Sequence, residues 1–160
     1  MIRSAAEPLV AEATRALSAR LGGGVVGIGI DAVDVGRFRV VLARRPTLVR
    51  RLFTAGEREY AALVPDPAPR LATRFATKEA VMKALGLGLG AFGFHDVEVV
   101  RSGRDAPTVV LHDAAADASR AAGVTRWHLS LTHTDLVALA AVVAEAPGPT
   151  GMATDDRADR

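Results

Sequence analysis

The chain has 160 residues, of which 49% are hydrophobic and 24% charged, and its formal net charge at pH 7 is +2. This length and balance predict one globular domain and exclude both an intrinsically disordered chain and two separate cores. Because the sequence has no cysteine, disulfides and thiolate zinc sites are excluded and a cytoplasmic location is expected.

Membrane and nucleic-acid functions are disfavoured as well. No run approaches the roughly 20 apolar residues that a transmembrane helix needs. Glu7 and Glu12 interrupt the apolar residues near the N-terminus, which argues against a secretory signal. The small net charge and the low aromatic content (4%) disfavour a nucleic-acid partner.

The first 24 residues are expected to form an accessory element. Residues 4–21 carry apolar side chains at helical spacing, and Ser4 and Glu7 have the spacing of a capping box. Three glycines at residues 22–24 then end the predicted helix.

An apolar strand with an acid at its end is predicted next. Residues 25–31 end in Asp31, and residues 34–45 predict a helix. Residues 37–51 contain no acid and six arginines, namely Arg37, Arg39, Arg44, Arg45, Arg50 and Arg51. Two interpretations remain open for them: a solvated face, or a docking surface for an acidic protein.

A short helix is predicted from Thr54 to about Leu63, because Thr54 and Glu57 repeat the capping-box spacing. Three prolines between residues 65 and 69 then predict a loop before the central helix.

The most informative helical pattern covers residues 74–86. Glu79 and Lys83 lie one turn apart on the flank of its apolar stripe, and a solvated ion pair is the simplest interpretation. Lys78 lies on the stripe itself, where a lysine is rarely left without a partner. Gly86 is placed to end the helix.

The remaining chain predicts strands and one further helix. A glycine-rich turn at residues 86–93 follows a helix rather than a strand, so the dinucleotide-binding fingerprint does not apply. Strands are predicted at 94–100, 107–111 and 126–132, a helix at Asp113–Ala122, and a strand or helix at 137–144. Residues 145–160 are expected to form a disordered tail.

Three of these segments together resemble the 4′-phosphopantetheinyl transferases, specifically the short holo-acyl-carrier-protein synthase group. The motifs are Gly-Ile-Gly-Ile-Asp at 27–31, Arg-Phe-Ala-Thr-Lys-Glu-Ala-Val-Met-Lys at 74–83, and Ser-Leu-Thr-His-Thr at 130–134. The resemblance covers residues 25–144, which we interpret as the transferase domain. Three motifs in matching order are far more specific than any one of them.

The resemblance implies an α+β fold in which a central helix packs on a mainly antiparallel sheet. It also implies a homotrimer with sites at subunit interfaces. The central helix and the hairpin that carries His133 would then reach one site from two different chains.

The implied reaction transfers the phosphopantetheine arm of coenzyme A to a serine of an acidic acyl carrier protein and releases adenosine 3′,5′-bisphosphate. Asp31 and Glu79 match the family's metal ligands, and Mg²⁺ suits one or two carboxylates with waters and substrate phosphates. Lys83 matches a lysine that contacts the pyrophosphate, its alternative being a solvated salt bridge. The acceptor of the serine proton stays open between Glu79 and Asp31, each acting through a metal-bound water.

The resemblance also implies binding roles away from the metal. The matched nucleotide-binding positions are Arg74, Lys78, Lys83, Thr132 and His133. Arg37 matches an arginine of the carrier-docking face. Because the turn that contains Arg104 is two residues longer than the family's turn, no contact is carried over to it. His95, His112 and His128 are given no role.

Three alternatives are weighed. A catalytically inactive carrier-binding module is disfavoured by the retained Asp31, Glu79 and Lys83. A nucleotide-binding regulatory protein that uses the glycine-rich turn is disfavoured because no strand precedes that turn. Carriers of fatty acid biosynthesis and of polyketide or peptide assembly lines both remain open.

Overall fold

The computed structural model describes residues 24–101, 103 and 105–147. The predicted N-terminal helix, Arg104 and nearly all of the predicted tail therefore lie outside the described residues. Within the described ranges, no helix is both long and apolar enough to cross a membrane.

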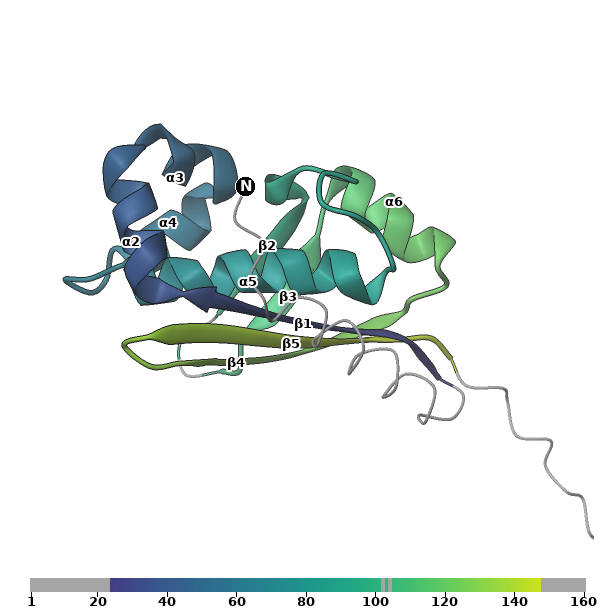
Figure 1. Cartoon of the computed structure of the whole chain (residues 1–160). Coiled ribbons are helices and arrows are strands. Elements are labelled where there is room, and N and C mark those ends of the chain that lie inside the picture. Colours follow the sequence, from purple (N-terminus) through teal and green to yellow (C-terminus); the bar gives the residue numbers. More distant parts are fainter. Residues whose placement is uncertain (1–23, 102, 104, 148–160) are drawn as a thin grey trace, which may run out of the picture.

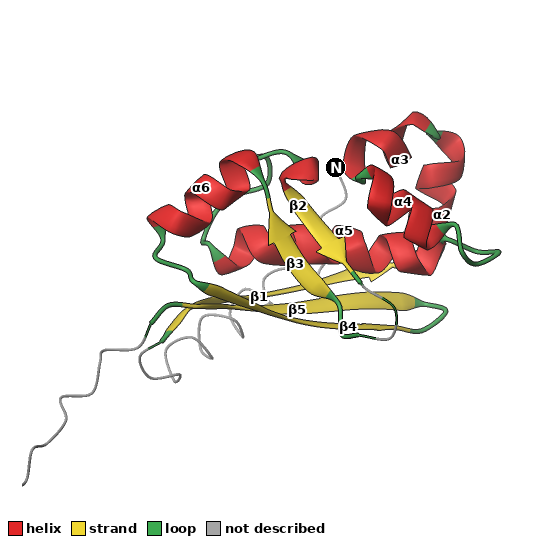
Figure 2. Cartoon of the chain, turned by 180° about the vertical axis from the view of Figure 1, so that it is seen from behind, coloured by secondary structure: helices red, strands yellow, loops and turns green. Residues whose placement is uncertain are grey.

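The architecture is α+β, as predicted (Figures 1 and 2). The strands are β1 (Val25–Asp34), β2 (Val97–Val100), β3 (Thr108–Leu111), β4 (Arg126–His133) and β5 (Val137–Glu145). The helices are α2 (Val35–Arg44), α3 (Thr47–Leu52), α4 (Ala55–Ala61), α5 (Ala68–Ala84) and α6 (Asp113–Ala121), with a 3₁₀ turn at Phe94–Asp96.

The strands form two antiparallel sheets. The larger has the order β1-β5-β4, and the smaller pairs β2 with β3. In the larger sheet Asp31 pairs with Ala140, which in turn pairs with Leu131, so β5 separates the two edge strands. Residues 137–144, for which the sequence left strand and helix open, therefore form a strand.

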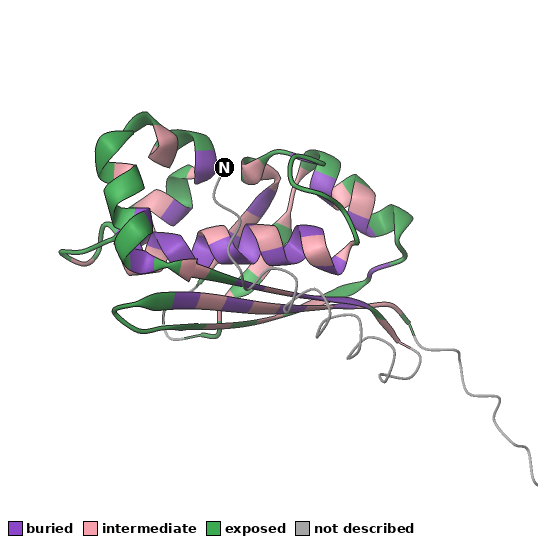
Figure 3. Cartoon of the chain, viewed as in Figure 1, coloured by how far each residue is buried: buried purple, intermediate pink, exposed green. Residues whose placement is uncertain are grey.

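Helix α5 is the centre of the fold. It lies along one face of the larger sheet, with α2, α3 and α4 gathered at one end and α6 near the other (Figure 1). Figure 3 shows that α5 is buried over most of its length, whereas the helices around it are exposed on their outer sides. Every second residue of β5 is fully buried beneath it, namely Ala138, Ala140, Val142 and Ala144.

Small side chains allow this helix to lie close to the sheet. Ala76 and Ala80 of α5 are fully buried in one core cluster with Ala140. A second cluster joins α5 to the helices at its N-terminal end through aromatic contacts. There the Phe38 ring lies 5.5 Å from that of Phe75, which stacks on Phe94 at the same distance.

Several element boundaries differ from the predictions. The helix at α5 begins at Ala68, because Pro69 can occupy a first helical turn, where no backbone donor is needed. Residues 94–96 form a 3₁₀ turn rather than the start of a strand, held by Asp96 accepting from the Gly93 backbone. The short α3 was not predicted. Gly86 does end α5, with φ at +69°.

Candidate active site

The centre of the site is an ion pair between strand and helix. Asp31 points from β1 toward α5, and its Oδ1 lies 2.8 Å from Nζ of Lys83. The same ammonium donates to the backbone oxygen of Ile30 at 3.3 Å. The Asp31 side chain is 10% exposed and that of Lys83 is 31% exposed, so the pair lies at the edge of the core with one side open to solvent.

Glu79 lies one helical turn before Lys83 and is half-buried. Residues four apart on a helix share a face, so Glu79 projects from the same flank of α5 as the lysine that reaches Asp31. The structure thus brings Asp31 and Lys83 together, and helix geometry places Glu79, 48 positions after Asp31, on the same flank of α5.

The chemistry of these donors fits magnesium better than a transition metal. In the described ranges, no group of three or more histidine, cysteine, aspartate or glutamate side chains could hold a metal ion. Zinc sites need three or four such ligands, whereas Mg²⁺ keeps several waters and accepts one or two carboxylates plus phosphate oxygens. Asp31 and Glu79 fit that second pattern.

Lys78 does not belong to this cluster. Its side chain is fully buried, and Nζ lies 2.8 Å from Oε2 of Glu57, also fully buried, and 2.7 Å from the backbone oxygen of Phe94. A third bond goes to the backbone oxygen of Val97. All three donors of the ammonium are therefore used inside the chain, which leaves none for the nucleotide phosphate that the resemblance assigned to it.

The Lys78–Glu57 pair ties three elements together. Glu57 on α4 also accepts from the backbone nitrogens of Val99 on β2 (3.1 Å) and Thr54 at the helix start (3.0 Å). Burial lowers the pKa of Lys78, although the neighbouring Glu57 carboxylate opposes that shift. This is a buried, hydrogen-bonded charge pair whose role is structural.

Arg74 also lies away from Asp31, on the α4 side of α5. It is 3% exposed, and its guanidinium lies 4.3 Å from the centre of the Tyr60 ring. Its Nε has no hydrogen-bond partner in the described part of the chain, and burial lowers the pKa of Arg74. The hydroxyl of Tyr60 is near Arg101 at 3.3 Å. Burial raises the pKa of Tyr60, but the surrounding arginines outweigh that effect and lower it.

Thr132 and His133 lie at the end of β4, on the opposite edge of the sheet from Asp31. Strand β5 lies between the two edges. Adjacent strands are about 4.8 Å apart, so two strand spacings separate the backbones. The described chain therefore does not bring Thr132 and His133 to the Asp31–Lys83 pair.

Arg37 is exposed at the start of α2, where its backbone nitrogen donates to Oδ1 of Asp34. Arg39, one of the six arginines, is neutralised by Asp66 at 2.7 Å. The hydrogen bond from Arg39 lowers the pKa of Asp66. The sequence showed no acid within the arginine stretch, but the fold supplies one from the loop before α5.

Sequence reasoning missed the partners on the far side of α5. Glu57 was interpreted only as a capping residue, although a lysine on an apolar stripe requires some acid. His112 was given no role, yet its Nε2 lies 3.0 Å from Oε2 of Glu98. Hydrogen bonds from Thr54 and His112 lower the pKa of Glu98. Only the packing of β2 on α5 shows which acidic side chain pairs with which basic side chain.

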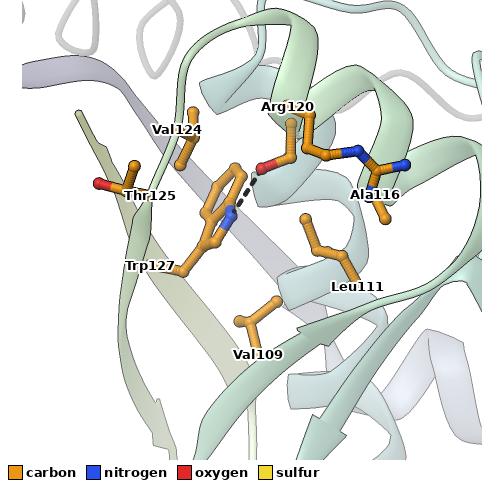
Figure 4. Close-up of a pocket in the computed structure, with 8 residues that line it drawn as sticks. Val109, Leu111, Ala116, Arg120, Val124, Thr125 and Trp127 are labelled. Carbon is orange, nitrogen blue, oxygen red and sulfur yellow. Dashed lines mark hydrogen bonds between the residues drawn. The ribbon is translucent and has the colours of Figure 1, made fainter. Parts of the chain in front are cut away.

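A cavity of about 220 Å³ lies elsewhere, between β3, α6 and β4 (Figure 4). Trp127 forms one wall and donates from its indole nitrogen to Oγ of Ser119 at 3.1 Å. Val109, Leu111 and Val124 contribute apolar side chains to the lining, Arg120 and Thr125 contribute polar ones, and no carboxylate lines the cavity. Since Trp127 belongs to β4, this cavity is on the other edge of the sheet from Asp31 and is not the candidate active site.

The comparisons with known proteins identify the class. The family model of the 4′-phosphopantetheinyl transferase superfamily matches residues 27–139, which include most of β1, all of α5 and β4, and the start of β5. The chain belongs to this superfamily.

Individual relatives agree with this assignment. The holo-[acyl-carrier-protein] synthase of Frankia casuarinae is 50% identical over 121 residues, which are 76% of this chain and 98% of that protein. The crystal structure of the synthase from Neisseria meningitidis is 30% identical, has a TM-score of 0.69, and covers 76% of this chain and 98% of its own.

A third relative carries a ligand. The holo-(acyl-carrier-protein) synthase from Bacillus anthracis, solved in complex with CoA (3′,5′-ADP), is 31% identical with a TM-score of 0.65. It covers 78% of this chain and 99% of its own. The predicted fold and family are thus confirmed.

The buried pair gives a first testable expectation. Lys78→Met should lower the free energy of unfolding by about 3–5 kcal/mol, because it leaves the Glu57 carboxylate buried without a cation. Lys83→Met, on the same helix but half-exposed, should lower it by less than about 1 kcal/mol. Urea unfolding at pH 7 measures both. A Lys78→Met protein within about 1 kcal/mol of the unchanged one would contradict the structural role.

Proposed function

We propose that this chain is a holo-acyl-carrier-protein synthase. It transfers the 4′-phosphopantetheine arm of coenzyme A to a serine hydroxyl of an apo acyl carrier protein and releases adenosine 3′,5′-bisphosphate. The observation that carries the proposal is the Asp31–Lys83 pair beside Glu79, which lies within the segment matched by the transferase family. The match over nearly the whole length of a named synthase supports the same reaction.

The reaction is a phosphoryl transfer. A bond forms between the serine oxygen and the phosphorus that carries the pantetheine arm, and the bond from that phosphorus to the nucleotide's 5′-phosphate oxygen breaks. Such a reaction depends on positioning and on neutralising negative charge. Asp31 and Glu79 would hold Mg²⁺, which when bound supplies that positive charge.

Lys83 acts on the leaving phosphate. Its ammonium is bonded to Asp31 but is partly exposed, so it can turn toward a pyrophosphate while remaining near the carboxylate. A cation at that position stabilises the charge that develops as the bridging bond breaks. The proton of the serine hydroxyl goes to a carboxylate-activated water, held by either Glu79 or Asp31.

The nucleotide site that we propose uses Arg74, Thr132 and His133, without Lys78. In one chain, β5 lies between the strand that carries Thr132 and His133 and the strand that carries Asp31, and Arg74 lies on the α4 side of α5. The site is therefore proposed to form between chains of a homotrimer, with the helix α5 of one chain facing the β4–β5 hairpin of the next.

The surface of the sheet supports such an assembly. Helix α5 covers one face of the β1-β5-β4 sheet, and no described helix covers the other (Figure 2). That other face carries apolar side chains from alternate positions, namely Val26, Ile28, Ile30, Leu139, Ala141 and Val143. Val26 is 38% exposed and Ile30, Leu139, Ala141 and Val143 are partly exposed, whereas Ile28 is buried at 4% exposure. A face of this kind is suited to burial against a second copy of the chain.

The exposed arginine face of α2 is proposed to dock the carrier protein, with Arg37 nearest to Asp31 along the chain. Both fatty-acid carriers and assembly-line carriers have acidic surfaces that such a face would attract. The alternative of an inactive carrier-binding module would retain this face but not the Asp31–Glu79–Lys83 cluster. The lack of cysteine fits the cytoplasmic location that we propose.

The deciding experiment is mass spectrometry of apo carrier proteins after incubation with the enzyme, coenzyme A and Mg²⁺. A fatty-acid carrier should gain the mass of one phosphopantetheine arm. An assembly-line carrier incubated under the same conditions shows which of the two classes of carrier gains the arm more readily. Absence of transfer to every carrier, with coenzyme A bound, would favour the inactive module.

Removal of the metal ligands should abolish transfer. Asp31→Ala and Glu79→Ala should each lower kcat by about 10²-fold or more, because each removes charge stabilisation at the reacting phosphate. Circular dichroism should show an unchanged fold, since Lys83 keeps contact with solvent. Chelation of divalent ions should reproduce the loss in the unchanged enzyme. Full activity in either variant, or after chelation, would refute the metal assignment.

Mixing experiments should show that one site draws on two chains. Glu79→Ala and His133→Ala homotrimers should both be impaired, and trimers reassembled from the mixture should regain activity, because some sites then lack neither residue. Asp31→Ala mixed with Glu79→Ala is the matched control, and it should regain nothing because both residues come from one chain. An active monomer in light scattering would overturn this arrangement.

Charge reversal at Arg37 should weaken carrier binding specifically. Arg37→Glu should raise KM for the carrier about tenfold, with KM for coenzyme A unchanged, if the contact contributes on the order of 1.4 kcal/mol. Added salt should weaken the unchanged enzyme more than the variant. Arg120→Glu on α6, at the other end of the molecule, makes the same change in net charge and should have little effect. Equal responses of both variants would mean that only net charge matters.

A further inference from the structure

Strand β1 approaches helix α5 so closely that no side chain fits between them at two positions. A Cβ atom placed on Gly29 would lie 1.8 Å from the backbone oxygen of Ala80 and 2.9 Å from the nitrogen of Ala84. At Gly27 it would lie 1.9 Å from the oxygen of Ala84. Neither glycine has a positive φ, so close packing, rather than backbone conformation, requires glycine here.

The contact at Gly29 lies within the candidate active site. Side chains alternate along a strand, so Asp31, two residues later, points to the same side of β1 and toward α5. The helical turn that Gly29 touches is the one that carries Lys83, whose ammonium reaches both Asp31 and the oxygen of Ile30. Glu79 immediately precedes Ala80 in the sequence.

We propose that Gly29 is a positioning residue: its missing side chain sets the spacing between β1 and α5, and with it the separation of the Asp31 and Glu79 carboxylates. This inference rests on the proposed metal site. Backbone atoms form the contact on the helix side, so a methyl group at residue 29 could be accommodated only by moving strand and helix apart, by on the order of 1 Å.

Gly27 provides a matched comparison. It meets the same helix with nearly the same overlap, but its contact is with Ala84, the last residue of α5, and it is four residues from Asp31. A helix end can shift while the preceding turn stays in place. A methyl group at Gly27 should therefore reduce stability without changing the spacing at Asp31 and Glu79.

The test is compensation by a longer carboxylate. Gly29→Ala should widen the gap and weaken divalent-ion binding about tenfold or more, and Asp31→Glu should weaken it because the extra bond of about 1.5 Å does not fit the unchanged gap. In the double variant the longer side chain spans the wider gap. We therefore expect the double variant to bind Mn²⁺ about tenfold more tightly than Gly29→Ala alone, a non-additivity that a merely structural role would not produce.

Binding is measured with Mn²⁺, by the electron paramagnetic resonance signal of the free ion, in the presence of coenzyme A and against a protein-free reference. Melting temperatures are recorded for every variant. Gly27→Ala should lose stability like Gly29→Ala, retain Mn²⁺ affinity within about threefold, and fail to rescue Asp31→Glu.

The outcomes separate the two levels of the proposal. No Mn²⁺ binding to the unchanged enzyme refutes the metal site and this inference with it. Binding without compensation in the double variant, or equal compensation by Gly27→Ala, refutes the role of Gly29 alone. If Gly29→Ala does not fold, Asp31→Glu decides: Mn²⁺ affinity equal to that of the unchanged enzyme overturns the inference, and weakened affinity at an unchanged melting temperature supports it.

Discussion

The close contact between β1 and α5 is the constraint on which the rest of the structure depends. Glycine at residues 27 and 29 and alanine at residues 80 and 84 remove the side chains that would normally separate a strand from a helix. The backbones then approach closely enough for Lys83 to span from helix to strand and meet Asp31 at 2.8 Å. The residues that allow close packing and the residues that carry the chemistry thus lie within the same two segments.

Helix α5 carries two lysines that differ in burial, and this difference sets the role that each charge can have. Lys78 is enclosed with Glu57 and has no solvent-facing donor, so its charge serves to join α4, β2 and α5. Lys83 has a similar acidic partner but keeps 31% of its side chain exposed. A charge pair that remains partly solvated can exchange its partner for a phosphate at little expense, whereas a buried pair cannot.

Much of this could be predicted from the sequence, and the limits have physical causes. Periodicity located β1, α5 and β4 but left β5 open between strand and helix, and the three motifs indicated Asp31, Glu79 and Lys83 as a group. Periodicity also placed Lys78 on the apolar stripe, but the sequence could not identify its partner, because Glu57 is 21 positions away and reaches it only through tertiary packing. For the same reason the Arg39–Asp66 pair was not foreseen. An acid that lies outside the arginine stretch in the sequence can neutralise one of its arginines once the chain folds.

The arrangement of the larger sheet is the reason for proposing that a single chain forms only part of the site. Asp31 and His133 are on edge strands with β5 between them, and antiparallel pairing fixes that order. No rotation of side chains can move a residue from one edge of a sheet to the other. If residues on both edges serve one nucleotide, as the family motifs imply, then a second chain must supply one of the edges. The partly exposed apolar side chains on the sheet face opposite α5 would give that second chain a surface on which to pack, so the proposed trimer would account for both the divided site and this face.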